Sequence, residues 1–320
     1  MELSIIIVNW NSVDYLRECL SSIYEFTRGI EFEIIIVDNA SPEANVDELC
    51  EAFPAVKIEK SAKNLGFAGA NNLGFVNSTG EFVLFLNPDT KLISPAVTNL
   101  LEKMRTLPDA GVLGCKLLNS DRSTQLSSIQ KFPKILNQIL DIDFLQQRWP
   151  GCPLWDISPL FSLTPDVFKV EMISGACMLL RRSVFAQVGM FSEEYFMYAE
   201  DIDLNYKVHQ AGFQNYYVSS SSIVHHGGGS SSRQRVNQWK TLMKYRAMRM
   251  YYQKMYGRPY EGLYRASMGC SAAFRLLLLG ILYPISGVLK KKESVLAAAD
   301  KWRTILKWAL GLERITPEQK

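Results

Sequence analysis

Short apolar runs that alternate with segments of helical spacing are the feature that most constrains the fold of this chain. Composition predicts buried strands at Ser4–Val8, Glu33–Val37, Val56–Glu59 and Phe82–Leu86. Helical spacing predicts helices at Tyr15–Ile23, Val46–Phe53, Ala68–Val76 and Ser94–Met104. Because strands alternate with helices, we expect βαβ units and an α/β fold with a mostly parallel central sheet flanked by helices.

The rest of the chain is less regular. Residues 119–170 hold five prolines and two tryptophans, which indicates a long variable insertion or lid. Beyond it we expect a strand over Met172–Arg181 and helices over Ser183–Val188 and about Glu200–Ala211. The tail from Val236 to Trp308 is predicted to be helical.

Composition excludes several classes of protein. In 320 residues, 48% are apolar and 21% charged, which argues against a disordered chain, collagen or a disulfide-rich scaffold. None of the six cysteines forms a CxxC pair, so we expect no zinc site and a reduced, cytoplasmic compartment. The first residues lack a basic region followed by an apolar stretch, so we expect no signal peptide.

The net charge of +3 hides an asymmetry along the chain. Residues 1–230 hold 17 lysines and arginines against 27 aspartates and glutamates, whereas residues 231–320 hold 18 against 5. An acidic body with a basic tail indicates an anionic partner for the tail, either nucleic acid or a membrane surface. The alternative is a solvated helical face without a partner.

Three polar clusters follow predicted strands, at Asn9–Ser12, Asp38–Ser41 and Asn87–Thr90. In sheets of this kind the ligand crevice lies beyond the carboxyl ends of the strands. A carboxylate at Asp38 with Asn39 can accept from a nucleotide base or a ribose hydroxyl, or it can form a turn before Pro42. The clusters therefore predict a ligand site at this edge.

The run Asn64–Gly74 is rich in glycine and asparagine. Its glycines allow close backbone approach and its asparagines supply paired donors and acceptors, which suits an anionic ligand. It lacks both a Walker A lysine and a GxGxxG pattern, so a turn-rich connection is the alternative.

Two acidic segments and one histidine pair are candidates for catalysis. Asp89, in Asn87–Asp89, can hold Mg²⁺ or Mn²⁺, which take few protein carboxylates and complete their shell with phosphate and water; the alternative is a turn. One carboxylate in Glu200–Asp203 can act as a general base, or the acids can simply favour a helix start. His225 and His226 can bind metal, or they can lie in a hinge.

Together and in this order, these segments resemble the family 2 glycosyltransferases, in particular the bacterial rhamnosyltransferase-like branch. The matching stretches are SIIIVNWNS, VDNAS, NLGFAGANNLG, FLNPDT, ISGACMLLRRSVFAQVGMFSEEYFMYAEDIDL and VHHGGGSS. The resemblance implies a GT-A fold, a nucleotide-sugar donor, a divalent metal and inversion at the anomeric carbon.

The resemblance also implies roles for single residues. It assigns donor contacts to Asn9, Asp38, Asn39, Asn64, Gly66, Asn71, Asn87, Gly175 and Ala176. It places Asp89 at the DxD metal motif, whose first position here is Asn, and His225 at a position that meets metal or diphosphate. A shift of one residue would select His226 instead.

The implied catalytic base is Asp201, with Glu200 as the nearby alternative. Metal would neutralise charge on the leaving diphosphate while the base takes the proton of the acceptor hydroxyl. One departure from the resemblance is Ser192, where related sequences usually have Asp, and it puts a supporting role at that position in doubt.

These expectations divide the chain in two. Residues 1–235 are predicted to form the catalytic domain, with a nucleotide-sugar half of about 1–118 and an acceptor half of about 119–235. Residues 236–320 are predicted to form a basic, helical, membrane-associating region. Its 14-residue apolar stretch Leu276–Leu289 is short for a crossing, which takes ~20 residues, so a peripheral or re-entrant anchor is expected, with a buried helix pair as the alternative.

The sequence thus predicts an inverting, metal-dependent glycosyltransferase at the cytoplasmic face of the membrane. The resemblance implies transfer of L-rhamnose from dTDP-L-rhamnose to a lipid-linked saccharide acceptor in synthesis of a cell-surface polysaccharide such as O-antigen. Alternatives are another donor, such as UDP-galactofuranose or UDP-glucose, and a catalytically silent nucleotide-sugar binding protein. Nucleic-acid binding is not expected, because the tail has no known motif and no interleaved stacking aromatics.

Overall fold

A computed structural model describes residues 1–42, 46–140, 142–227, 238–286 and 292–313. The chain divides into two units. The first comprises residues 1–132, 141–196 and 200–232, and the second comprises residues 133–140, 197–199 and 233–320. The predicted chemistry-bearing residues all belong to the first unit.

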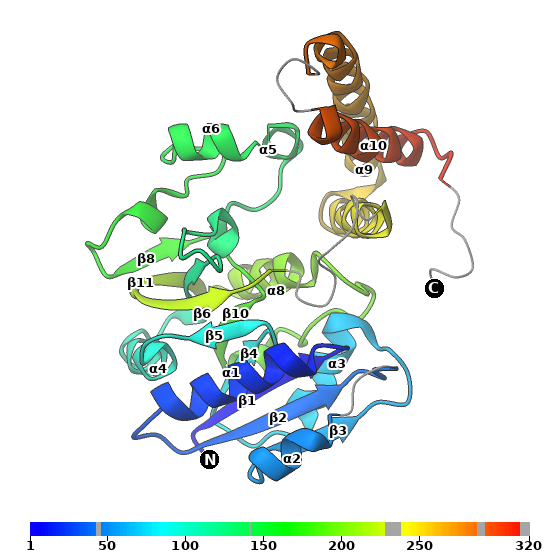
Figure 1. The fold of residues 1–320 in the computed structure, drawn as a ribbon. Coiled ribbons are helices and arrows are strands. Elements are labelled where there is room, and N and C mark those ends of the chain that lie inside the picture. Colours follow the sequence, from blue (N-terminus) through cyan, green and yellow to red (C-terminus); the bar gives the residue numbers. More distant parts are fainter. Residues whose placement is uncertain (43–45, 141, 228–237, 287–291, 314–320) are drawn as a thin grey trace. The chain divides into compact units, whose positions relative to one another are not determined.

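A mixed sheet forms the centre of the first unit (Figure 1). Its order is β3-β2-β1-β4-β10-β6-β11-β5, and β8 pairs with β11. The strands are β1 (Leu3–Asn9), β2 (Phe32–Asp38), β3 (Lys57–Lys60), β4 (Phe82–Leu86), β5 (Thr90–Leu92), β6 (Ala110–Leu118), β8 (Val167–Val170), β10 (Cys177–Arg181) and β11 (Gln214–His225). A separate pair joins β7 (Ile129–Gln130) to β9 (Met172–Ile173).

The α/β class with a central sheet flanked by helices is confirmed. Strands β1 to β4 run parallel where they pair, but β10 runs antiparallel to both β4 and β6. The chain enters β10 from an irregular segment and not from a crossover helix, so the rule that makes βαβ units parallel does not apply there. The sheet is therefore less uniformly parallel than the sequence indicated.

Five strands had no counterpart in the sequence prediction: β5, β6, β7, β8 and β11. Both β6 and β11 are long, and β11 includes the serine run Ser219–Ser222. Tyr216, Val218 and Ile223 are buried on β11, so packing places this polar segment inside the sheet.

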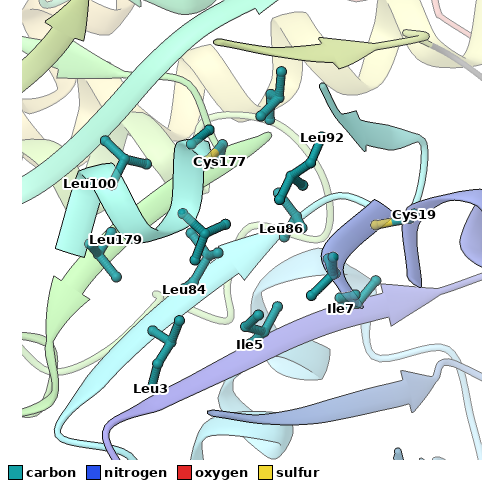
Figure 2. Close-up of a cluster of buried hydrophobic side chains, with 14 of the residues drawn as sticks. Leu3, Ile5, Ile7, Cys19, Leu84, Leu86, Leu92, Leu100, Cys177 and Leu179 are labelled. Atoms are coloured by element: carbon teal, nitrogen blue, oxygen red, sulfur yellow. The ribbon is translucent and has the colours of Figure 1, made fainter. Parts of the chain in front are cut away.

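Helices cover both faces of the sheet. On one face lie α1 (Val13–Phe26), α2 (Glu48–Ala52) and α4 (Ala96–Thr106), whose buried side chains form one cluster with Leu3, Ile5 and Ile7. Figure 2 shows part of this cluster, including Cys19 of α1 and Leu84 of β4. Alternate strand residues point to opposite faces, and each fully buried aliphatic side chain stabilises the fold by about 1.5–3 kcal/mol.

The opposite face carries α3 (Gly66–Val76) and α7 (Arg182–Gln187). Gly74 lets α3 approach the sheet, because a Cβ atom there would lie 2.5 Å from Ile6 Cγ2. Phe185 of α7 packs against Phe75 and Phe85, with ring centroids 4.8 and 4.7 Å apart. The predicted helices of this half are therefore present and their apolar sides are buried.

The region 119–170 contains only short elements in its described part: η1 (Leu126–Ser128), β7, α5 (Ile135–Ile139), α6 (Asp143–Arg148), η2 (Ser158–Phe161) and β8. The strand expected over Met172–Arg181 is interrupted between β9 and β10. The interruption spans Ser174–Ala176, where the backbone N–H of Gly175 donates to the side chain of Asp201 and not to a neighbouring strand. The predicted helix near Glu200 is present as α8 (Glu200–Gln210).

The second unit is helical, as the sequence of the tail indicated. It contains α5, α9 (Gln238–Ser286) and α10 (Lys292–Ala309). Helix α9 is two helices joined across Gly257, whose φ of 83° and ψ of 171° break the helix just before Pro259. Trp308 of α10 packs against Tyr264, with ring centroids 5.9 Å apart.

By length and composition alone, the helix over Gln238–Pro284 is long enough and apolar enough to cross a membrane. Its most apolar window has a mean hydropathy of 1.5, and 22% of that window is buried. The helix is thus much longer than the apolar run seen in the sequence. A buried core helix of a soluble protein meets the same criterion, but such a helix is mostly buried.

Candidate active site

The carboxyl ends of β1 and β2 carry two polar side chains that contact each other. Asn9 and Asp38 are partners in the parallel register, and Asn9 Nδ2 donates to Asp38 Oδ1 over 2.9 Å. Ser41 Oγ donates to the same oxygen over 2.6 Å, and the Asp38 side chain is buried. These contacts fix a carboxylate at the sheet edge where the sequence predicted contacts to a base and a ribose.

Asn39, Asn64 and Gly66 hold one another in the loop before α3. Asn39 Nδ2 donates to Asn64 Oδ1 over 2.9 Å, and Asn39 Oδ1 accepts from Leu65 N–H over 2.7 Å. Gly66 has a φ of 71°, and a Cβ atom there would collide with the carbonyl oxygen of Phe196. The asparagine side chains shape this loop. The first residue of α3, Gly66, lies so close to the backbone of Phe196 that only glycine fits.

Asn71 lies apart from that group. Its Nδ2 donates to the carbonyl of Phe67 one turn earlier in α3, over 2.9 Å, and its side chain is buried. The neighbouring Asn72, which the sequence did not single out, donates to Phe191 O over 2.9 Å and accepts from Phe191 N–H over 3.1 Å. The contact of Asn71 with a nucleotide stays a prediction, whereas Asn72 ties α3 to the chain beyond α7.

A second polar group lies between β4 and the end of β11. Asp89 Oδ1 is 3.3 Å from His225 Nε2, and Asn87 Nδ2 is also 3.3 Å from that nitrogen. The pairing of β5 with β11 sets this geometry, because it places His225 opposite Thr90. The strand register thus brings together the three residues predicted at the metal site.

His226 points elsewhere. Its Nδ1 lies 2.8 Å from Ser120 Oγ, and its ring centroid is 5.4 Å from that of Tyr15. Only its backbone approaches Asp89, where His226 N–H donates to the carbonyl oxygen over 2.9 Å. Successive residues at a strand end point to opposite sides, so His225 is the imidazole beside the Asp89 carboxylate.

The groups around Asp89 fit a hard divalent cation. Carboxylate oxygen and imidazole nitrogen are ligands of Mg²⁺ and Mn²⁺, and Asn87 Oδ1 is buried with no hydrogen-bond partner among the described residues. Within the described ranges, no group of three or more His, Cys, Asp or Glu side chains is placed to hold a metal. A cation held by Asp89 and His225 would therefore need further oxygen ligands, such as phosphate or water.

The predicted base lies in the first turn of α8. Asp201 Oδ2 accepts from Gly175 N–H over 3.1 Å, and Asp201 Oδ1 accepts from Ile202 N–H over 2.9 Å. Burial raises the pKa of Asp201 above its ordinary value of 3.8, and these two hydrogen bonds oppose the shift. Among the residues that the structure describes, the carboxylate is thus held in place without a salt bridge that would lower its basicity.

Glu200 is in a different state from its neighbour. Burial, and then the charge of Asp201, raises the pKa of Glu200 well above its ordinary value of 4.5. Its Oε2 is buried and has no hydrogen-bond partner in the described part of the chain. Burial therefore favours the protonated form of Glu200 more strongly than that of Asp201, so Asp201 is the better suited of the two to act as a base.

One short segment connects the two polar groups. The carbonyl of Ala176 accepts from Asn87 N–H over 3.0 Å, while the adjacent Gly175 donates to Asp201. A Cβ atom on Gly175 would lie 3.2 Å from Asp201 Cβ. The predicted metal site and the predicted base are thus anchored to the same turn between β9 and β10.

At two positions the structure adds to what the sequence analysis predicted. Gln125 contacts His225 through both ends of its amide, and no motif or spacing in the irregular region 119–170 singled it out.

Ser192, where the resemblance led us to expect an acid, donates to Asp203 Oδ2 over 2.5 Å and accepts from Lys207 Nζ over 3.0 Å. The hydroxyl therefore takes part in a buried polar network at the base of α8.

Solved structures share this architecture. One is GalNAc-T7 with UDP, GalNAc and Mn²⁺, with a TM-score of 0.60 and 14% identity; the match covers 85% of this chain and about half, 51%, of that chain. Another is the mannosyltransferase PcManGT from Pyrobaculum calidifontis with GDP-Man and Mn²⁺, with a TM-score of 0.58 and 16% identity, covering 97% and 84%. The fold is therefore of the GT-A type that these two structures share.

Sequence comparison identifies the family to which the chain belongs. The family model described as "Glycosyl transferase family 2" matches residues 4–189, and the chain belongs to this family. An N-acetylglucosaminyl-diphospho-decaprenol L-rhamnosyltransferase of Mycobacterium tuberculosis is 30% identical over 227 residues, covering 68% of this chain and 73% of the relative. Rhamnosyltransferase WbbL of Escherichia coli is 27% identical over 221 residues, covering 67% and 79%. The predicted rhamnosyltransferase-like family is confirmed.

Proposed function

We propose that this chain transfers L-rhamnose from dTDP-L-rhamnose to a lipid-linked saccharide acceptor, with inversion at the anomeric carbon. The observation that carries the proposal is the 30% identity to a relative named as an L-rhamnosyltransferase acting on a decaprenol-linked sugar. WbbL, named as a rhamnosyltransferase, supports the same sugar. An O-antigen biosynthesis protein of Myxococcus xanthus, 26% identical over 16% of its own length, supports a role in the synthesis of a surface polysaccharide. The product would enter a cell-surface polysaccharide.

Two groups of residues at strand ends would hold the donor. Asp38, fixed by Asn9 and Ser41, offers a carboxylate to base or ribose hydroxyls at the end of β2. Asp89 and His225 would hold Mg²⁺ or Mn²⁺, in keeping with the two structural neighbours, which were solved with UDP or GDP-Man together with Mn²⁺. When bound there, the cation would neutralise negative charge on the diphosphate leaving group.

Asp201 supplies the base. Its carboxylate accepts the proton of the attacking acceptor hydroxyl, while the hydrogen bonds from Gly175 and Ile202 keep its orientation fixed. The oxygen attacks the sugar carbon from the face opposite the leaving diphosphate, which accounts for inversion. Gly175 and Ala176 link this base to Asn87, so the base and the donor site are held by one turn.

The test uses the purified full chain with a lipid-linked acceptor extract. Each of dTDP-L-rhamnose, UDP-galactofuranose and UDP-glucose is supplied separately with Mg²⁺ or Mn²⁺, and the products are analysed by mass. We expect a mass increase of one deoxyhexose with dTDP-L-rhamnose only. If a hexose is added from either UDP sugar, the proposed donor is wrong and that UDP sugar takes its place. If no donor gives transfer although donors still bind, the chain is a catalytically silent binding protein.

We also propose that the second unit docks on the anionic, cytoplasmic face of the membrane. A stripe of exposed side chains runs along α9 at helical spacing, with 41% to 63% exposure: Phe274, Leu277, Leu278, Ile281 and Leu282. Exposed cations accompany it in the same unit, among them Lys301 and Arg303 of α10. An apolar face with nearby basic residues favours the surface of an anionic bilayer.

Vesicle co-sedimentation tests this docking. Leu277→Glu should reduce binding of the full chain to vesicles that contain anionic lipid. Leu163→Glu is the matched control, since Leu163 belongs to the first unit and is 70% exposed against 63% for Leu277. Equal binding of the two variants, or binding to neutral vesicles that salt does not weaken, would contradict the proposal.

A further inference from the structure

Gln125 makes two hydrogen bonds to a single residue, His225. Gln125 Nε2 donates to the backbone carbonyl of His225 over 2.6 Å. Gln125 Oε1 lies 2.9 Å from Nδ1 of the same histidine. The amide therefore spans the backbone and the ring of one residue, 100 positions away in the sequence.

The first of these bonds fixes which end of the amide faces the ring. A carbonyl oxygen only accepts, so the end of Gln125 that faces His225 O must be the NH₂ group. The amide oxygen is then left facing Nδ1, and that oxygen also only accepts. The hydrogen bond consequently requires a proton on Nδ1 of His225.

A proton on Nδ1 determines the state of the other ring nitrogen. In the neutral imidazole only one nitrogen carries hydrogen, so Nε2 presents a lone pair. That lone pair faces Asp89 Oδ1 at 3.3 Å. Asn87 Nδ2 also lies 3.3 Å from Nε2, in reach to donate to this lone pair. Nε2 and the Asp89 oxygen are nevertheless both acceptors, and a cation between them would satisfy both.

Gln125 is itself held by the backbone of β6 and η1. Its N–H donates to Leu117 O over 2.9 Å, and its carbonyl accepts from Ser128 Oγ over 2.7 Å. Ser128 Oγ in turn accepts from Leu117 N–H over 3.0 Å. The amide thus projects from an anchored position, as a residue that orients another side chain must.

We propose that Gln125 is a positioning residue that keeps His225 in the Nδ1–H tautomer and so presents Nε2 to the divalent cation shared with Asp89. The inference rests on the cation site of the proposed function. It assigns Gln125 no contact with substrate or metal. Loss of such an outer partner weakens metal binding by about 10–100-fold in other sites.

The test compares Gln125→Met, which has similar length and no hydrogen bonds, with Gln125→Glu, which keeps an acceptor for Nδ1–H. Gln187→Met, at an exposed position of α7, is the matched control for the substitution. Thermal unfolding of each variant checks that the fold is retained.

The first readout needs no metal. ¹⁵N-labelled histidine in the full chain reports the tautomer by NMR at a pH near 9, where histidine is ordinarily neutral. Subtraction of the spectrum of a His225→Gln variant assigns the signal. We expect Nδ1–H in the wild type, Gln187→Met and Gln125→Glu, and a mixture or the Nε2–H form in Gln125→Met.

The second readout is Mn²⁺ affinity, followed by electron paramagnetic resonance in the presence of a nucleoside diphosphate. We expect about 10–100-fold weaker binding in Gln125→Met and recovery to within a few-fold in Gln125→Glu. If Asp89→Asn abolishes Mn²⁺ binding while Gln125→Met changes neither tautomer nor affinity, the role of Gln125 is refuted and the cation site stands. If the wild type binds no Mn²⁺, the cation site fails, and the inference fails with it.

Discussion

Gly175 N–H donates a hydrogen bond of 3.1 Å to Oδ2 of Asp201, although 26 residues separate them. With Ile202 N–H on Oδ1, each carboxylate oxygen has one backbone donor and retains further acceptor capacity. Such a group stays oriented and can still take a proton. Substitutions of Asp201 and of Glu200 should therefore have different effects on turnover.

Asp201→Asn should remove the general base while keeping a side chain of the same size and shape. We expect turnover to fall by at least about 10²-fold, because a positioned general base contributes ~10²–10⁴-fold. Donor binding, measured by calorimetry, should be unchanged, because the proposed donor contacts lie on other elements. Undiminished turnover in this variant would exclude Asp201 as the base.

The Glu200→Gln variant should behave almost like the wild type. Glu200 is buried and its pKa is raised well above 4.5, which favours the uncharged carboxyl, and glutamine matches the shape and charge of that form. We expect turnover within about threefold and an unchanged or slightly higher Tm. A loss of turnover comparable to that of Asp201→Asn would move the base to Glu200.

The pH profile should carry the signature of the buried Asp201. Its pKa is raised by burial, so the ionised form that accepts a proton is lost at a higher pH than for an exposed aspartate. We therefore expect kcat/KM to fall as the pH drops, with the acid limb above 3.8. Glu200→Gln should leave this limb in place, whereas an acid limb at or below the ordinary value would contradict the burial argument.

Gly175→Ala should disturb the base without unfolding the protein. The added Cβ would lie 3.2 Å from Asp201 Cβ and 3.3 Å from its Oδ2, closer than ordinary contacts. We expect a fall in kcat of roughly 10-fold or more, since small displacements of catalytic groups are costly. Gly151→Ala is the control, because a Cβ atom there meets nothing within 4 Å. Equal kcat values in the two variants would show that Gly175 does not position Asp201.

Glu33 should dominate the acid sensitivity of the fold. Burial alone would raise its pKa, but hydrogen bonds from Lys57, Ser4 and Thr79 lower it to about 2. Its contribution to the free energy of unfolding is present above the ordinary pKa of 4.5 and is lost as the pH falls toward about 2.

Glu33→Gln should therefore lower the free energy of unfolding at pH near 7 by about 1–3 kcal/mol and flatten its decline in acid. Urea unfolding at several pH values measures both effects. Glu31→Gln, at an exposed position, is the control and should change neither. A Glu33 variant with wild-type acid sensitivity would mean that other carboxyl groups carry the effect.

The fold was predictable where local pattern and topology agree. The runs that became β1, β2 and β4 are continuous, apolar and separated by helical segments, so their strand state and parallel pairing follow from sequence. The polar residues Asn9 and Asp38 then had to meet at one edge. No comparable pattern marks β11, whose polar serine run became a strand only because the sheet packs around it.

The site was predictable in its residue types and not in its contacts. Asp89 and His225 are 136 residues apart, and the pairing of β5 with β11 brings them to 3.3 Å. The resemblance selected His225, but a shift of one residue in the motif would have selected His226 instead. In a strand that same shift reverses the direction of the side chain, so only one ring faces Asp89.

The sequence by itself determined the alternation of strands and helices, the edge where polar residues gather and the order of the family motifs, because these depend on local composition and on the geometry of βαβ units. Tertiary structure alone decided that burial raises the pKa of Glu200 more than that of Asp201, and that Gln125 lies within hydrogen-bond distance of the His225 ring. Protonation and tautomer depend on burial and on partners far away in the chain, and neither is encoded in the spacing of neighbouring residues.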